Sequence, residues 1–369
     1  MTEPGPIVWL EDYRPEDRCR VGGKNASLGE MIAAGLPVPP GFAVTTDAYD
    51  TMRRDPDVRD AVDRLLDAAT DDPTALETTS RRVRDLLESV PVAAEVDQAI
   101  RHGYLTLCER CGVDDVPVAV RSSATCEDLP EASFAGEHDT YLWVRGQAAV
   151  VEHVRRCWSS LFTARAISYR RQMGFAAELV CMSVGVQKMV DPRVSGVAFT
   201  LNPTDGDRSQ IAIDASWGLG EAVVAGEVTP DYFLVDKVLH AIVKRTISPK
   251  AVEYRVVDDG VEKLEVEAER QSVPCLSDDE ITSVALMARR AERHYGCPQD
   301  IEWAIDRHLP GPDNVVLLQS RPETVWSRQP RTVSRNEASF MDGIVATLLA
   351  PTHASAARPT STVEEEAPA

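Results

Sequence analysis

The stretch from Val118 to Asp139 limits the possible fold and chemistry of this chain more than any other. It begins with the apolar run Val118–Val120 and turns abruptly polar at Arg121. A strand that leads into a loop of arginine, hydroxyl and small side chains suits phosphate oxygens, because such a loop supplies many N–H and O–H donors. Within the loop, Ser133 and Gly136 are candidate contacts. A solvated loop after an edge strand would show the same pattern.

A glycine turn near the N-terminus gives a second candidate for anion binding. Gly22 and Gly23 precede Lys24, and the helix that follows ends at Gly35. Glycines let the backbone approach an anion closely, and a lysine at a helix N-terminus favours phosphate. A plain turn with an exposed lysine is the alternative.

Composition narrows the class of protein. The chain has 369 residues, 43% of them hydrophobic, and a net charge of -20. This acidity argues against a nucleic acid or an anionic membrane as partner, because no basic surplus meets their phosphates. No apolar run is long enough for a transmembrane helix, and the N-terminus lacks the apolar core of a signal peptide. We therefore expect a cytoplasmic protein, and its eight scattered cysteines are expected to be reduced thiols.

The pattern of elements predicts an α+β fold in two lobes. We expect a first lobe over residues 1–185 with a charged helical insertion at about 47–112, to which we assign no chemistry. Residues 186–326 are expected to form the second lobe, and 327–369 a linker and a disordered tail rich in Ala, Pro, Thr and Glu. Apolar residues at helical spacing predict one helix at about 147–172.

Two further segments have clear local signals. Val184–Val190 and Ser195–Thr200 flank an Asp-Pro-Arg turn, which predicts a β-hairpin. In it, Lys188 could meet a phosphate or an adenine ring, or simply face outward. The helix over 277–295 is expected to begin with a capping box of Ser277 and Glu280 and to end at Gly296.

Two strands near the end of the ordered sequence carry the strongest candidates for metal binding. Residues 300–306 alternate apolar and polar, and residues 315–323 begin apolar and end polar. If the strands pair antiparallel, Glu302 and Gln319 present oxygens together, which suits Mg²⁺. Arg321 would then reach a phosphoryl group in transfer. A rim of solvated polar residues at strand ends is the alternative.

Taken together, these motifs resemble the ATP-binding N-terminal domain of the phosphoenolpyruvate synthase and pyruvate phosphate dikinase family. Rifampicin phosphotransferase and phenylphosphate synthase share this module. The motifs that carry the resemblance are GGKNASLGEM at 22–31, PVPPGFAVTTDAY at 37–49, VAVRSSAT-EDLPEASFAGE at 118–137, SGVAFTLNP at 195–203, GLGEAVV-GEVTPD at 218–231, and DIEWA with LLQSRPET within 300–324.

The resemblance implies an ATP-grasp-like fold that binds ATP and Mg²⁺. By position, Lys24 and Arg121 resemble the cations that grip phosphates, and Glu302 and Gln319 resemble the metal ligands. Arg321 resembles the arginine that stabilises the phosphoryl group in flight. The resemblance also implies nucleotide contacts from Lys188 and Glu221.

Full-length relatives continue into a swivelling domain whose histidine carries the phosphoryl group, and into an acceptor domain. The expected function is therefore the ATP-activating subunit of a split dikinase-type phosphotransferase, in which ATP is converted to AMP and phosphate. Its partner subunit would carry the histidine and the acceptor site. Resemblance to the ATP-binding subunit of phenylphosphate synthase favours phenol or cresol as acceptor.

Two alternatives remain. One is the ATP-binding part of a split phosphoenolpyruvate synthase or of a rifampicin-type phosphotransferase. The other is a regulatory module that binds ATP without catalysis. The presence of Arg321 beside the other candidates argues against the second, because a sensor does not need a group for phosphoryl transfer.

Overall fold

The structure is a computed structural model, and it describes residues 5–70, 72–124, 128–129, 132–133, 139–173, 181–257, 260–311 and 314–326. Residues Met1–Thr324 belong to one compact unit, and Val325–Ala369 to a second. The candidate Gly136 and the tail from residue 327 lie outside the described residues. Ser133 is described by its backbone alone, which forms part of β5 (Ala132–Ser133).

The first of two larger sheets has five strands in the order β1-β2-β7-β3-β6. They are β1 (Ile7–Trp9), β2 (Gly41–Val44), β3 (Val118–Ala124), β6 (Thr140–Val144) and β7 (Met182–Lys188). All neighbours are antiparallel. β3 runs Val-Ala-Val before Arg121, and its valines are fully buried. The predicted apolar strand before Arg121 is therefore confirmed.

Helices pack on this sheet and on one another. They are α1 (Arg18–Ala33), α2 (Thr46–Arg53), α3 (Pro56–Asp67), α4 (Pro73–Ser89), α5 (Ala94–Cys111), α6 (Gln147–Ser159) and α7 (Ala164–Met173), with the short turns η1 (Leu10–Asp12), η2 (Pro15–Asp17) and η3 (Ser160–Phe162). Asp55 and Asp72 accept backbone N–H groups at the starts of α3 and α4, and each precedes a proline at the first helical position.

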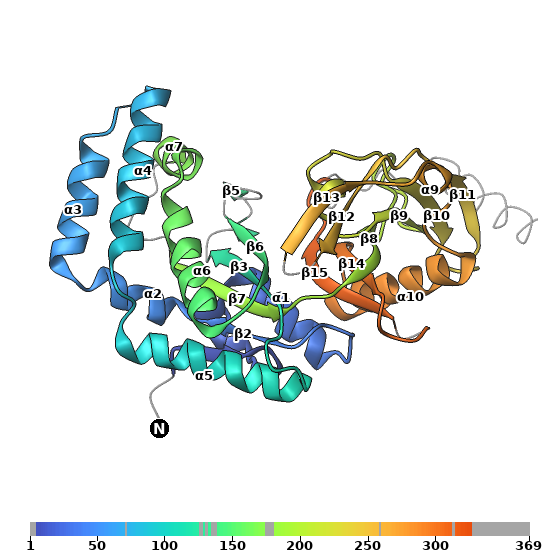
Figure 1. Ribbon diagram of the computed structural model, residues 1–369. Coiled ribbons are helices and arrows are strands. Elements are labelled where there is room, and N and C mark those ends of the chain that lie inside the picture. Colours follow the sequence, from blue (N-terminus) through green and yellow to red (C-terminus); the bar gives the residue numbers. More distant parts are fainter. Residues whose placement is uncertain are drawn as a thin grey trace, which may run out of the picture. The chain divides into compact units, whose positions relative to one another are not determined.

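Helices α2 to α5 occupy the residues predicted at about 47–112 as a helical insertion (Figure 1). That this segment is an insertion into the first lobe stays a prediction. The single helix predicted at about 147–172 is wrong in one respect. The chain leaves α6 through the short turn η3 and restarts as α7, so the apolar spacing continues across a break.

The second sheet has six strands in the order β11-β10-β9-β8-β14-β15. They are β8 (Pro192–Phe199), β9 (Gln210–Trp217), β10 (Asp231–Asp236), β11 (Ile242–Thr246), β14 (Gln299–Asp306) and β15 (Val315–Pro322). Two small sheets pair β12 (Val252–Val257) with β13 (Gly260–Glu265), and β4 (Asp128–Leu129) with β5 (Ala132–Ser133). The remaining helices are α8 (Glu221–Val224), α9 (Ala268–Gln271) and α10 (Asp278–Tyr295).

Helix α10 packs along the six-stranded sheet (Figure 1). It begins with the predicted capping box, in which the Ser277 hydroxyl accepts the Glu280 N–H and the Glu280 carboxylate accepts the Ser277 N–H. It ends at Gly296, whose φ of 67° is left-handed. Ile281, Val284 and their neighbours bury the apolar face against this sheet.

The β-hairpin predicted within residues 180–200, from the strands Val184–Val190 and Ser195–Thr200, is wrong. β7 lies between β2 and β3 in the five-stranded sheet, so both of its edges are occupied, and β8 lies in the other sheet. The Asp-Pro-Arg segment is therefore not a hairpin turn: Met189–Asp191 connect one sheet to the other. The division into lobes at residues 185 and 186 stays a prediction.

Helix α1 contacts both sheets. It packs on β3 and β7 of the first sheet and on β15 of the second. Leu28 and Met31, in its second half, belong to the hydrophobic core of the six-stranded sheet. One helix thus connects the strand that bears Arg121 with the strand that bears Gln319 and Arg321.

Candidate functional site

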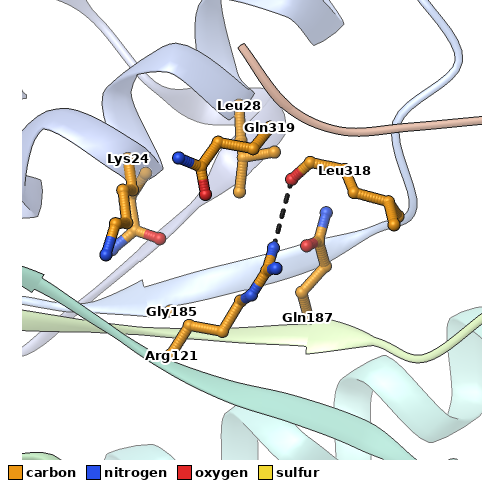
Figure 2. Close-up of a pocket in the computed structure, with 8 residues that line it drawn as sticks. Lys24, Leu28, Arg121, Gly185, Gln187, Leu318 and Gln319 are labelled. Carbon is orange, nitrogen blue, oxygen red and sulfur yellow. Dashed lines mark hydrogen bonds between the residues drawn. The ribbon is translucent and has the colours of Figure 1, made fainter. Parts of the chain in front are cut away.

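A pocket forms where α1, β3, β7 and β15 meet (Figure 2). Its lining includes three of the residues predicted from the sequence: Lys24, Arg121 and Gln319. They come from positions separated by up to about three hundred residues in the chain, so only the fold brings them together. Asn25, Leu28, Gly185, Gln187 and Leu318 complete the lining.

Lys24 follows a sharp interruption of α1. Gly22 has φ 72° and ψ 169°, outside the helical region, and the helix resumes directly after it. The predicted glycine turn before a helix is therefore confirmed, with one helical turn preceding it. Lys24 donates from Nζ to the backbone carbonyl of Ser122, 3.3 Å away, which places its ammonium group beside β3.

Close packing explains the glycines around this helix. A Cβ on Gly22 would lie 2.3 Å from the carbonyl oxygen of Ser123. Asn25 is buried, and its Nδ2 donates to the Val21 carbonyl and to the Ser183 hydroxyl at 2.9 and 3.1 Å. A Cβ on Gly185 would lie 2.3 Å from the side-chain oxygen of Asn25. Helix and sheet therefore touch backbone to backbone, which fixes Lys24 in place.

Arg121 links the two sheets. Its Nη1 donates to the backbone carbonyl of Leu318 at 3.2 Å, as Figure 2 shows. Its Nη2 forms an ion pair with Glu302 Oε2 at 3.3 Å. The two side chains remain 24% and 33% exposed, so the pair lies at the site's open side, where solvent weakens it. A predicted phosphate-binding cation thus contacts a predicted metal ligand directly.

Glu302 and Gln319 are direct partners across the antiparallel pair β14–β15. The antiparallel pairing on which the predicted metal site depends is therefore present. A β-bulge follows Glu302, where the register shifts before Trp303. Bulges re-aim side chains and occur often beside functional sites.

The side chains of Glu302 and Gln319 are of the kind that binds a hard divalent cation. A carboxylate and an amide supply oxygen ligands, and Mg²⁺ typically takes only one or two protein ligands, with water and phosphate as the others. Among the described residues, no group of three or more His, Cys, Asp and Glu side chains gathers as a metal site. A cation would therefore depend on nucleotide oxygens as well as on the protein.

Arg321 lies two residues after Gln319 and is held by Asp300. Its Nε is 3.4 Å from Asp300 Oδ2, and the two residues are partners across β14 and β15. Burial raises the pKa of Asp300, and the Arg321 charge opposes that rise. Asp300 Oδ1 is buried without a hydrogen-bond partner among the described residues. The carboxylate therefore orients Arg321, a role that sequence reasoning missed.

A hydroxyl network joins α1 to β15. Ser27 Oγ donates to the Ser320 carbonyl at 2.7 Å, and Tyr295 OH donates to the Ser27 carbonyl at 3.1 Å. Burial raises the pKa of Tyr295 to about 12, so its phenol stays a donor at neutral pH. Ser320 lies between Gln319 and Arg321, so the network positions the strand that carries both relative to the helix that carries Lys24.

We expect Ser27→Ala to lower the free energy of unfolding by about 1–2 kcal/mol, because the partly buried carbonyl of Ser320 loses its side-chain donor. Denaturant unfolding measures this change. Ser283→Ala is the control, since the Ser283 hydroxyl donates to the backbone carbonyl of Asp279, four residues earlier in the exposed first turns of α10. Equal losses in the two variants would show that the link between α1 and β15 contributes nothing.

The structure does not bring every predicted residue to this pocket. Glu302 and Arg321 are absent from its lining, although Glu302 forms an ion pair with the lining residue Arg121. Lys188, at the end of β7, and Glu221, an exposed residue at the start of α8, are absent too. Their nucleotide contacts stay predictions, as do those of Ser133 and Gly136. Sequence reasoning missed Asn25 and Gln187 as lining residues. The signal for Gln187 was a polar side chain within an apolar strand, and it is buried, with Nε2 donating to the Pro39 carbonyl.

Comparisons with known proteins fit this geometry. Residues 18–339 match the family model of the pyruvate phosphate dikinase AMP/ATP-binding domain. The chain is 45% identical over 345 residues to a probable phosphoenolpyruvate synthase of Staphylothermus marinus, which covers 87% of this chain and 41% of that protein. A probable phosphoenolpyruvate synthase of Methanothermobacter thermautotrophicus is 45% identical over 86% of this chain and 46% of its own length. The phosphoenolpyruvate synthase of Aeropyrum pernix is 42% identical over 88% and 43%.

This chain therefore belongs to the pyruvate phosphate dikinase AMP/ATP-binding domain family. The predicted family and the predicted α+β, ATP-grasp-like fold are confirmed. The matching family model describes an AMP/ATP-binding domain, which supports ATP as the nucleotide. The chain spans less than half the length of these three relatives. The finer resemblance to phenylphosphate synthase stays a prediction, because these relatives are named as phosphoenolpyruvate synthases. Among the described residues, no helix is long and apolar enough to cross a membrane.

Proposed function

We propose that this chain binds Mg²⁺·ATP and activates it for phosphoryl transfer in a dikinase-type phosphotransferase. One observation carries the proposal: Lys24, Arg121 and Gln319 line a single pocket, and Glu302 lies beside it. Glu302 forms an ion pair with Arg121 and is the cross-strand partner of Gln319. Two cations beside an oxygen-ligand pair match the needs of a polyphosphate and its metal ion.

The residues divide the chemical work. Lys24 and Arg121 would bind phosphate oxygens, and the arginine can do so in a bidentate manner. Glu302 and Gln319 would hold Mg²⁺, which draws negative charge from the phosphates when bound. Arg321, released from Asp300, would neutralise the charge that develops on the phosphoryl group in transfer.

The phosphoryl group would pass to a histidine on a further domain, either in a partner subunit or elsewhere in a longer protein. The names of the relatives support a phosphoenolpyruvate synthase-type reaction, with pyruvate as acceptor, over the phenolic acceptor expected from the sequence. No described residue supports phenol or cresol specifically. A cytoplasmic location belongs to the same proposal.

Glu302→Gln tests the proposed metal site. We expect the affinity for Mg²⁺·ATP to fall about 30-fold, because the cation loses its charged protein ligand. With EDTA present, ATP affinity should stay the same or rise, because Arg121 is no longer paired with a carboxylate. Calorimetric titration with ATP, with and without Mg²⁺, measures both values.

Asp306→Asn is the matched control, since it makes the same carboxyl-to-amide change on the same strand, where Asp306 accepts the His308 N–H instead of pairing with Arg121. It should leave both affinities unchanged. If Glu302→Gln and Asp306→Asn bind Mg²⁺·ATP as tightly as the wild-type chain, Glu302 is not a metal ligand.

The acceptor is tested by capture of partners from the native host, followed by an assay of the purified assembly. ATP, Mg²⁺ and either pyruvate or phenol are supplied, and AMP and the phosphorylated product are measured. Phosphoenolpyruvate as product would support the proposal. Phenyl phosphate as product would instead support the phenolic acceptor. A regulatory module would be favoured if an assembly with a phosphorylatable histidine bound ATP but formed no AMP.

A further inference from the structure

Helix α10 has one face packed on the six-stranded sheet and an opposite face directed away from it (Figure 1). Asp279, Leu286 and Arg293 lie on this outer face at intervals of seven residues, close to two helical turns, and all three are exposed. Leu286 is 41% exposed. A single exposed leucine needs no explanation by itself, but this one lies between two opposite charges at the same spacing.

The outer face of α10 is acidic at its start and basic at its end. The first turn holds Asp278, Asp279 and Glu280, and the last two turns hold Arg289, Arg290, Arg293 and His294. These signs complement the helix dipole. The dipole accounts for the charges at the two ends, but it does not account for an exposed leucine midway between them.

Two of these charges have no partner within the chain. Asp278 pairs with Arg245, whereas the side chains of Asp279 and Arg293 form no ion pair or hydrogen bond with any other residue that the structure describes. Both are therefore available to a second molecule. They are also the two charges placed symmetrically about Leu286.

This symmetry makes the face complementary to itself. Asp279 lies about 10.5 Å before Leu286 along the helix axis, and Arg293 lies the same distance after it. Two such helices that cross at Leu286 in antiparallel orientation place Asp279 of each copy beside Arg293 of the other. A shallow crossing of about 20° keeps these pairs close at both ends. A parallel pair would bring like charges together instead.

A neighbouring turn enlarges the apolar part of the surface. Val238 and Leu239, between β10 and β11, are 75% and 77% exposed. Asp236 accepts both of their backbone N–H groups at 2.8 and 2.7 Å, which holds the turn in shape. His240 then contacts Arg289 of α10 at 2.7 Å, so this exposed aliphatic pair flanks the basic half of the helix.

We propose that the outer face of α10 binds the same face of a second copy of this chain, as an antiparallel helix pair related by a two-fold axis at Leu286. Closed two-fold dimers of this kind use one self-complementary patch on both subunits. The contact area is smaller than the roughly 1,200–2,000 Å² of a standard interface, so the dimer is weak. The proposal does not depend on the function proposed above, because no residue of α10 lines the nucleotide pocket.

Sedimentation equilibrium of the full chain over a concentration series tests the interface. We expect reversible association to a dimer with a Kd in the micromolar range. Leu286→Glu should weaken it at least tenfold without lowering Tm, because it places a charge at the centre of the contact. Leu105→Glu is the matched control, since Leu105 is an equally exposed leucine, 42%, on α5. It should dimerise as the wild type does.

Charge reversal tests the antiparallel arrangement. Asp279→Arg and Arg293→Asp should each weaken self-association about tenfold, because each puts like charges together at both ends of the helix pair. An equimolar mixture of the two variants should regain the wild-type Kd, since every facing pair is then of opposite sign. This rescue distinguishes a specific pairing from a general effect of net charge.

Three results would overturn the proposal. The first is a wild-type chain that stays monomeric at every concentration, which would leave this face to another domain or protein. The second is a Leu286→Glu variant that dimerises like Leu105→Glu, because the dimer would then form through another surface. The third is a mixture of Asp279→Arg and Arg293→Asp that associates no more tightly than either variant alone.

Discussion

Changing Arg321 to Ala should slow phosphoryl transfer from ATP by about a thousandfold, while ATP affinity stays within about threefold of the wild-type value. Arg321 is more than half exposed and makes its ion pair with Asp300, whereas Glu302 is paired with Arg121. Its removal therefore leaves the phosphate cations and the oxygen ligands in place. An interaction made only in the transition state lowers the rate and not the binding.

The measurement has two parts. Calorimetry gives the affinity for Mg²⁺·ATP, and labelled ATP with the assembly that contains the phosphorylatable histidine gives the rate of transfer. Arg245→Ala is the matched control, because Arg245 is also an arginine on the six-stranded sheet paired with an aspartate, Asp278, but on the opposite edge strand. The rate of phosphoryl transfer in Arg245→Ala should stay at the wild-type value.

Arg321→Lys separates charge from shape. Lysine keeps the charge but loses the planar fork of donors, so we expect it to recover only part of the lost rate. Transfer at the wild-type rate in Arg321→Ala would contradict the proposed role. An equal loss in Arg321→Ala and Arg245→Ala would mean that the sheet, rather than the reacting group, had been disturbed.

Local patterns were enough to predict the strand pair that carries the candidate metal ligands. Alternation placed Glu302 on the polar face of one strand, and the polar end of the next strand carries Gln319, so the metal site required only that the two strands pair antiparallel. The structure pairs these residues directly. The capping box at Ser277 was equally local, since its two hydrogen bonds involve residues three apart.

Contacts between distant elements could not be predicted in this way. Val184–Val190 had the pattern of a strand, but alternation does not identify the neighbouring strands, and β7 is inserted between β2 and β3. The ion pair of Arg121 with Glu302 depends on the packing of one sheet near the other. Asp300, which orients Arg321, had the sequence signature of an ordinary polar strand residue.

The resemblance to a family predicts the chemical roles of the site residues, and the structure shows how those residues are arranged. Lys24, Arg121 and Gln319 were named from motifs that lie far apart in the chain. Their meeting in one pocket depends on α1, which packs on β3, β7 and β15. The local geometry of that helix should therefore affect the whole site.

Gly22→Ala should lower the free energy of unfolding by about 3–4 kcal/mol and weaken ATP binding severely. At φ 72° and ψ 169°, Gly22 occupies a backbone region that is essentially restricted to glycine, which alone costs a side chain about 1–3 kcal/mol. The added Cβ would also lie 2.3 Å from the Ser123 carbonyl oxygen and 2.4 Å from its hydroxyl oxygen. Backbone of α1 or β3 must therefore move.

Gly35→Ala is the matched control, because Gly35 also has a positive φ, 69°, but an added Cβ there would meet no atom within 4 Å. It tests a positive φ without the clash, so it should lose no more than about 1–2 kcal/mol and keep its affinity for ATP. Thermal or denaturant unfolding, with calorimetric titration of ATP, gives both quantities for each variant.

The comparison also separates two explanations for lost binding in Gly22→Ala. If α1 is displaced from β3, Lys24 moves with it, and binding should stay weak even at temperatures where the variant is fully folded. If the only effect is lower stability, ATP affinity measured well below Tm should equal that of Gly35→Ala. We expect the first result, because Lys24 is two residues from the clash and donates to Ser122, which neighbours the residue that the added methyl group would strike.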